Sequence, residues 1–312
     1  MELPFNQPLV RDLAWVMVSP SLLAESIGVV SNDTCQSIYK VNHGWLLKLD
    51  AQPELLVTTL EQNKSHRLGY YFEHLVAFWL QQRIADEYFA SHVRVFEEKR
   101  TIGEFDFLFK TSRSDTLVHW ETAVKFYLRY QAEDEKIWWY GPNAQDRLDI
   151  KLDRVFNHQL KLSDSPQGRA LLQEKAFENV RSQTFFKGYL FYPVTSDWYH
   201  PQSLPDTIAP GHLTGWWTRV NELELPDHEA DHRWMVLPRL EWLAPMVIHQ
   251  EGDSSLMDTR QLIDYLEQHF DRGQQSLLLA QMALEANSCW QEKTRGFVVS
   301  PDWPNQRDRT QK

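Results

Sequence analysis

The chain has 312 residues and a formal net charge of -11, with 43 Asp and Glu residues against 32 Lys and Arg residues. A hydrophobic content of 42% and a charged content of 24% are ordinary for a globular protein and exclude a mainly disordered chain. The acidic balance disfavours a surface coated with phosphate-binding charge, although a local basic groove is compatible with it.

Two features bear on the compartment in which the protein works. Cys35 and Cys289 lie far apart and outside any CxxC spacing, which disfavours a disulfide framework and a thiolate zinc site. The apolar run over residues 13–18 is too short for a membrane span, and no secretory signal pattern precedes it. We therefore expect a cytoplasmic protein without a membrane partner, and the sequence leaves its oligomeric state open.

Apolar periodicity predicts the elements of the first two thirds of the chain. Residues 25–63 give no clear pattern, and the polar stretch over 112–115 predicts the turn of a β-hairpin. The predicted elements are, in chain order, helices over 8–23 and 67–87, strands over 92–98, 102–109 and 116–130, a loop over 131–144, a helix over 144–162 and a strand over 185–192.

The last third begins with a predicted long connection over residues 196–230, rich in Pro and acidic residues. The order of all elements predicts an α/β (α+β) fold with a mixed central sheet flanked by helices. The predicted elements after the connection are a strand over 233–243, a helix over 259–270, an apolar segment over 277–284 and a strand over 296–300. The predicted domains are an N-terminal helical extension over 1–66, a core over 67–195 and a C-terminal α+β extension over 196–312 that packs on the core.

The first strand of the predicted hairpin separates aromatic from acidic side chains. Successive side chains of a strand point to opposite faces. Phe105, Phe107 and Phe109 are therefore expected on one face, whereas Glu104 and Asp106 are expected on the other. The aromatic face is the one that we expect to pack against flanking helices.

The second strand of the hairpin adds Glu121 and Lys125 to the acidic face. A turn at residues 112–115 puts Asp106 opposite Glu121, whereas a turn shifted by one residue puts Asp106 opposite Ala123. Both registers collect the same charged side chains on one surface, so the sequence leaves both open.

Carboxylates that oppose each other across a sheet repel unless something neutralises them. A hard cation such as Mg²⁺ does so because it prefers oxygen ligands. A lysine beside such a cation can polarise a water molecule or stabilise developing phosphate charge. The alternative is a solvated polar face on which Lys125 forms an ordinary ion pair with Glu104 or Glu121.

Four short stretches of the sequence carry a resemblance to a known family. They are Arg11-Asp12-Leu13-Ala14-Trp15, Gly103-Glu104-Phe105-Asp106-Phe107, Ala123-Val124-Lys125-Phe126-Tyr127-Leu128 and Gly141-Pro142-Asn143. Through them, most of the chain resembles an uncharacterised bacterial family catalogued as domain of unknown function 1853. Residues 67–193 also resemble the PD-(D/E)XK nuclease superfamily, in the order helix, three strands, helix, strand, with an acid in the second strand and Glu and Lys in the third.

The superfamily resemblance implies a restriction-endonuclease-like core and a Mg²⁺- or Mn²⁺-dependent phosphodiesterase whose partner is nucleic acid. It implies that Asp106 and Glu121 bind the metal and that Lys125 orients the attacking water. Glu104 or Glu73 would assist the metal site. The chain departs from the superfamily in one respect, because Glu121 and Lys125 are four residues apart instead of two, roughly 13 Å along a strand. The alternative is a catalytically degenerate nuclease fold that serves as a binding module.

The predicted helix over residues 144–162 carries Arg147, Lys151 and Arg154 on one side at helical spacing. This stripe is a candidate phosphate-binding surface. The resemblance adds Gln159, because related nucleases sometimes carry a Gln of the site near this position. The alternative is a solvated helix face with ion pairs to the interleaved aspartates.

A rival hypothesis rests on the segment His228-Glu229-Ala230-Asp231-His232, which matches H-E-x-x-H. On a helix, the two histidines of this motif bind zinc and the Glu acts as a base. Glu251, 19 residues after His232, is a candidate third ligand. Pro226 and Pro238 leave room for only a short helix, so the choice is between a zinc-dependent hydrolase and a polar connection.

Overall fold

A computed structural model of the protein describes residues 3–25, 28–62, 65–201, 204–226, 232–249, 255–285 and 289–305. Tertiary contacts divide the chain into two compact units, each assembled from separate stretches of sequence. Unit 1 consists of Met1–Lys125, Ile150–Gly188 and Pro205–His212. Unit 2 consists of Phe126–Asp149, Tyr189–Leu204 and Leu213–Lys312.

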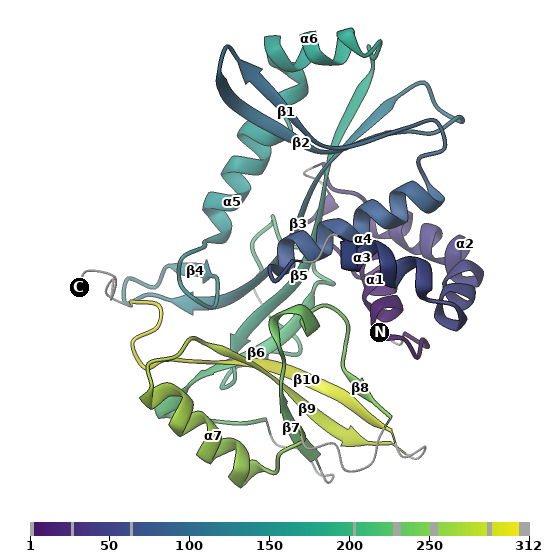
Figure 1. Ribbon diagram of the computed structural model, residues 1–312. Coiled ribbons are helices and arrows are strands. Elements are labelled where there is room, and N and C mark those ends of the chain that lie inside the picture. The colour runs from purple at the N-terminus through teal and green to yellow at the C-terminus, as the bar shows by residue number, and fades with distance from the viewer. Residues whose placement is uncertain are drawn as a thin grey trace. The chain divides into compact units, whose positions relative to one another are not determined.

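Unit 1 holds most of the helices and the first hairpin of the chain (Figure 1). Its helices are α1 (Pro8–Val18), α2 (Asn32–Ala51), α3 (Glu54–Gln62), α4 (Leu68–Arg83), α5 (Leu148–Arg154), which starts at the unit boundary, and α6 (Pro166–Glu174). Its strands are β1 (Tyr88–Glu97), β2 (Arg100–Lys110) and the first parts of β3 (Leu117–Gln131) and β5 (Val180–Pro193). A π-helical turn (Val155–Gln159) follows α5 directly, and a 3-10 turn (Leu162–Asp164) precedes α6.

Unit 2 is mainly β-structure with one long helix (Figure 1). It contains the remaining parts of β3 and β5, together with β4 (Ile137–Tyr140), β6 (Leu213–Arg219), β7 (His232–Val236), β8 (Val247–Ile248), α7 (Thr259–Asp271), β9 (Leu277–Leu284) and β10 (Trp290–Val299). Strand β4 pairs with β3, and β8 pairs with β10.

The hydrogen-bonded strands follow the order β1-β2-β3-β5-β6-β10-β9-β7. Strands β1, β2 and β3 pair antiparallel, whereas β6 is parallel to both β5 and β10. The predicted α/β fold, with a mixed sheet flanked by helices, is therefore confirmed.

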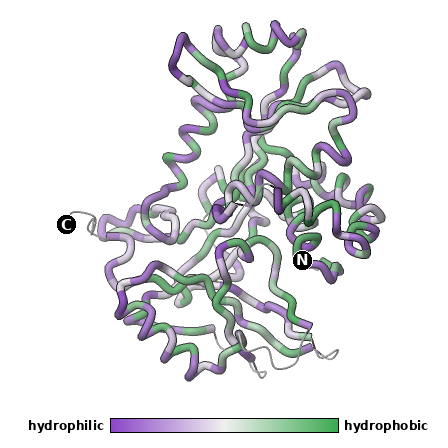
Figure 2. Tube along the Cα trace, in the orientation of Figure 1, coloured by the Kyte–Doolittle hydropathy of each residue, from purple (hydrophilic) through white to green (hydrophobic). Residues whose placement is uncertain are grey.

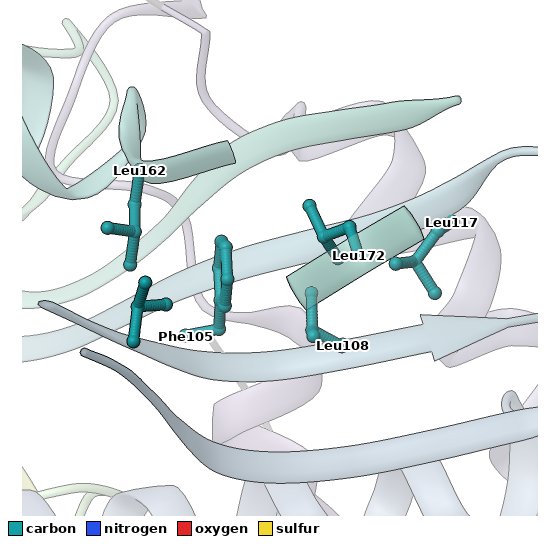
Figure 3. Packing of buried hydrophobic residues seen from close by; sticks show 6 residues of the cluster. Phe105, Leu108, Leu117, Leu162 and Leu172 are labelled. Carbon is teal, nitrogen blue, oxygen red and sulfur yellow. The ribbon is translucent and has the colours of Figure 1, made fainter. Parts of the chain in front are cut away.

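Both faces of the sheet in unit 1 are covered by apolar packing. On one face, Trp79 of α4 lies 5.7 Å from the ring of Trp120 in β3 and 6.0 Å from that of Phe185 in β5, measured between ring centroids. On the other face, a buried cluster joins the strands to α6 and the preceding turn (Figure 3). Its buried members are Val95, Phe105, Leu108, Leu117, Leu162 and Leu172. The hairpin is thus held between two apolar layers.

The structure corrects the prediction that Phe105, Phe107 and Phe109 share one face. Phe105 points to the same side as Leu108 (Figure 3), whereas Phe109 packs edge-on against Trp120 in the other layer. The alternation of β2 is therefore interrupted between Phe105 and Phe107, at Asp106.

Other corrections concern short elements. The predicted loop over 131–144 contains β4, and the predicted connection over 196–230 contains β6. The helix predicted from 144 begins at Leu148, because Ala144 has a left-handed backbone with φ of 56°. The strand predicted over 233–243 ends at Val236, since Pro238 removes a backbone donor.

Helix α7 confirms the helix predicted over 259–270. Asp258 and Gln261 form a reciprocal capping box at its start. Hydrophobic and hydrophilic residues alternate along it (Figure 2), as is typical of an amphipathic helix with one buried side. Across the parts of the chain that the structure describes, no helix combines the length and the apolar character needed to cross a membrane.

Candidate active site

The hairpin register brings the two predicted metal-binding acids together. Phe107 of β2 pairs with Trp120 of β3, and Phe109 pairs with Val118. Continued by one residue, this register places Asp106 opposite Glu121, and the charge of Asp106 acts on Glu121. This is the first of the two registers left open by the sequence, and it is confirmed.

Asp106 takes part in the pairing of the strands through its side chain. The backbone N–H of Thr122 donates to Oδ2 of Asp106 at 2.8 Å, and the Thr122 hydroxyl lies 3.3 Å from the same oxygen. The carboxylate therefore accepts the Thr122 N–H in the place of a backbone carbonyl of β2. This position fixes the carboxylate on the sheet and accounts for the interruption of β2.

Glu121 is the most deeply buried acid of the group, with a residue exposure of 1%. Its Oε1 lies 3.6 Å from Nζ of Lys151 in α5, and its Oε2 has no hydrogen-bond partner. Burial first, and then the charge of Asp106, raise the pKa of Glu121 to about 8, although Lys151 counteracts part of the rise. A buried carboxylate with an unused oxygen is costly unless a further positive group neutralises it.

Glu73 of α4 joins the same group from the helix that covers the sheet. Burial raises its pKa to about 7, and the nearby charges of Asp106 and Glu104 add to the rise. Burial also raises the pKa of Asp106, while the hydrogen bond from Thr122 and the charge of Lys151 lower it. Asp106 of β2 therefore interacts with both Glu73 of α4 and Glu121 of β3.

Glu104 lies at the more exposed end of the group. Its Oε2 accepts from Nε of Arg94 at 3.0 Å, and its Oε1 lies 3.1 Å from Nδ1 of His92. The other ring nitrogen of His92 lies 3.9 Å from Glu73, so the histidine stands between two acids. His92 has a left-handed backbone with φ of 54°, a strained conformation of the kind that clusters at functional sites.

The lysine that meets the carboxylates is Lys151, which the sequence placed only on a candidate phosphate-binding stripe. Its Nζ also donates to Oε1 of Gln159, at the end of the π-helical turn, at 3.2 Å. Lys125 is half-buried on β3, four residues past Glu121. The assignment of Lys125 as the lysine of the site remains a prediction.

The other residues of the predicted basic stripe have different surroundings. Arg147 precedes α5, lies in unit 2, pairs with Asp149 at 2.6 Å and stacks over the ring of Trp138 at 4.3 Å. Arg154 is exposed at the end of α5. Lys151 is thus the member of this stripe that forms an ion pair with Glu121, and the charge of Arg154 also lowers the pKa of that acid.

The candidate zinc motif falls mostly outside the described residues, because 227–231 and 250–254 include His228, Glu229 and Glu251. His232 begins strand β7, where it pairs with Ala283 of β9. The zinc motif requires its second histidine on a helix, so the strand at His232 disfavours that hypothesis.

The carboxylate group suits a hard divalent cation in its chemistry. Its donors are oxygens from Glu73, Glu104, Asp106 and Glu121, the ligands that Mg²⁺ and Mn²⁺ prefer. The buried Oε2 of Glu121 lacks a partner, and burial, followed by the charge of Asp106, raises the pKa values of Glu73 and Glu121. With the side chains as they stand, no group of three or more His, Cys, Asp or Glu residues within the described ranges is arranged to hold a metal ion.

Fold and site together define a mixed α/β protein with a buried acidic site. The sequence matches the family described as "Domain of unknown function (DUF1853)" over residues 11–299. The chain therefore belongs to this family. Neither a curated protein nor a solved structure matches the chain.

Proposed function

We propose that this protein is a metal-dependent phosphodiesterase of the PD-(D/E)XK type that acts on nucleic acid. One observation carries the proposal: carboxyl groups from α4, β2 and β3 meet beside one lysine, and burial, followed by the charge of Asp106, raises the pKa of Glu73 to about 7 and of Glu121 to about 8. Acids with strongly shifted pKa values are typical of functional sites when ion pairs do not balance their charge. If these positions served only the stability of the fold, apolar residues there would stabilise it more than buried acids do.

In this proposal, Asp106 and Glu121 hold Mg²⁺ or Mn²⁺, and Glu73 and Glu104 assist. The bound cation would act as a Lewis acid and would lower the pKa of a water molecule. Asp106 is suited to its role because the N–H of Thr122 fixes one of its oxygens. Glu121 is suited because one of its oxygens faces Lys151 while the other is unused.

Lys151 is the lysine that we assign to the attacking water and the developing phosphate charge. Its ammonium group lies 3.6 Å from Glu121 and also donates to Gln159, which helps to orient it. Lys125, the lysine implied by the superfamily pattern, would have to reach back roughly 13 Å along β3. We therefore assign this role to Lys151 of α5 and not to Lys125 of β3.

The test is metal-stimulated cleavage by the purified protein and its Asp106→Asn variant. Asn keeps an oxygen that can accept from Thr122, so the fold is preserved while the ligand charge is lost. We expect cleavage of labelled DNA or RNA in Mg²⁺ or Mn²⁺ to fall at least a thousandfold. Equal cleavage by the two proteins would exclude the assignment.

The binding-module alternative predicts a different result for the same protein. A degenerate site would show no cleavage in any divalent metal and no rise in melting temperature when Mg²⁺ or Mn²⁺ is added. A metal-dependent rise that disappears in Asp106→Asn would favour the enzyme. The two measurements together separate the two functions.

A further inference from the structure

One face of strand β1 leads away from the carboxylate group. His92, Arg94 and Phe96 are exposed, whereas Val93 is half-buried and Val95 is buried. We call the three exposed residues the β1 row. His92 contacts Glu104 and Glu73 of the site. The next two members face solvent: the Arg94 side chain is 66% exposed and Phe96 is 51% exposed.

The opposite side of the same strand is occupied by the fold. Val95 is buried in the apolar cluster beneath α6, and Glu97 accepts from Gln167 of α6 at 2.7 Å. The hydrogen bond to Gln167 thus holds the carboxylate of Glu97 away from the β1 row. Glu98, Lys99 and Arg100 are exposed where β1 turns into β2, so two cations follow one acid there, and Arg94 precedes the exposed ring along the chain.

The pairing at Phe96 keeps its ring uncovered. The register between β1 and β2 shifts between Val95 and Phe96, so that Phe96 faces Thr101. Such irregularities re-aim side chains and are common next to active sites. Thr101 is itself exposed and too small to cover the ring.

We infer that the β1 row binds a single strand of nucleic acid as it leaves the carboxylate site, an inference that rests on the proposed function. Arg94 offers a guanidinium group to a phosphate while its Nε remains on Glu104. Phe96 offers a flat apolar surface on which a base stacks. The distance from His92 to Phe96 along the strand is roughly 13 Å, which about four stacked nucleotides cover.

The exposed ring selects single strands over duplexes. A base can lie on Phe96 only when its face is not already stacked inside a helix. The net charge of -11 disfavours binding by phosphate contacts alone. Stacking therefore supplies the selective part of the affinity, and Arg94 adds one phosphate contact.

The experiment measures binding in an Asp106→Asn background, so that cleavage does not consume the probe. Fluorescence anisotropy with labelled oligothymidine and oligouridine, each alone and annealed to its complement, gives Kd for DNA and RNA in both forms. We expect single strands to bind more tightly than duplexes and Phe96→Ala to raise the single-strand Kd about tenfold. Arg94→Gln should reduce the slope of log K against log salt by about 0.7.

Matched variants separate stacking from a loss of fold. Phe96→Tyr keeps an aromatic surface and should bind as the parent does. Tyr265→Ala removes a ring of α7 that is 41% exposed and should leave the Kd unchanged. Duplex binding as tight as single-strand binding, no measurable binding, or a Phe96→Ala variant that binds like the parent would each overturn the inference. If single strands bind through Phe96 while the protein with Asp106 cleaves nothing, the inference holds and the proposed enzymatic function fails.

Discussion

Each unit of this protein buries charge, but in different ways. In unit 2, Arg295 is 2% exposed and Nε lies 2.5 Å from Oε1 of Glu292, whose side chain is 5% exposed. Arg295 also donates to the carbonyl oxygens of Trp242 and Ala244, and Glu292 accepts the N–H of Met246 at 2.8 Å. In this pair, charge and hydrogen bonding are matched.

The carboxylate group of unit 1 is not matched in this way. Glu73, Asp106 and Glu121 share the charge of Lys151, and one buried oxygen of Glu121 has no partner. A matched buried pair fixes one arrangement of the chain, whereas excess buried charge costs stability until a ligand neutralises it. The difference indicates that the pair of unit 2 serves the fold and the group of unit 1 serves a function.

The largest expected effect on stability is in unit 2. Arg295→Met should lower the free energy of unfolding by about 3–5 kcal/mol, because it leaves Glu292 buried without a counter-charge. Urea denaturation measures the change. A loss of unfolding free energy below about 1 kcal/mol would mean that the pair of Arg295 and Glu292 does not stabilise the fold.

A smaller effect concerns the two lysines near the carboxylate group. Lys151→Met should reduce metal-dependent cleavage about a hundredfold, or about 2.7 kcal/mol, because it removes the cation beside Glu121. Lys125→Met is the matched control, and we expect it to lose less activity. If the larger loss falls on Lys125, the superfamily pattern in the sequence is the better guide to the site.

The smallest expected effect has the opposite sign to that of Arg295→Met. The pKa of Glu121 is raised from 4.5 to about 8, so the folded protein retains a proton that the unfolded chain releases. The metal-free protein therefore loses stability as the pH rises from about 4.5 to 8. Glu121→Gln should match the parent at pH 4 and exceed its melting temperature by roughly 5 °C at pH 9.

The same variant offers a control with metal. Mg²⁺ should raise the melting temperature of the parent more than that of Glu121→Gln, because the variant lacks one of the two charged ligands, Asp106 and Glu121. A Gln variant that is less stable than the parent at pH 9 without metal would show that Glu121 is a structural acid like Glu292. The contrast between the two units would then disappear.

Much of the fold could be predicted from local pattern. Long periodic segments such as α4, β3 and α7 were predicted close to their observed bounds, because many side chains repeat the same preference. Strands β4 and β6 were missed, since they are too short to show a period and lie among turn-forming residues. The position of Phe105 could not be predicted, because the side chain of Asp106 interrupts the alternation on which the prediction depended.

The sequence by itself determined the α/β class and limited the residue opposite Asp106 to Glu121 or Ala123, because strand period and turn length are local properties of the chain. The structure selected the register of Glu121. Tertiary structure alone decided that Glu73 reaches Asp106 from α4 and that Lys151, 30 residues beyond Glu121, is the lysine beside that acid. It also decided the place of His92 between Glu104 and Glu73. These contacts depend on how helices pack on a sheet, and no spacing in the sequence encodes that packing.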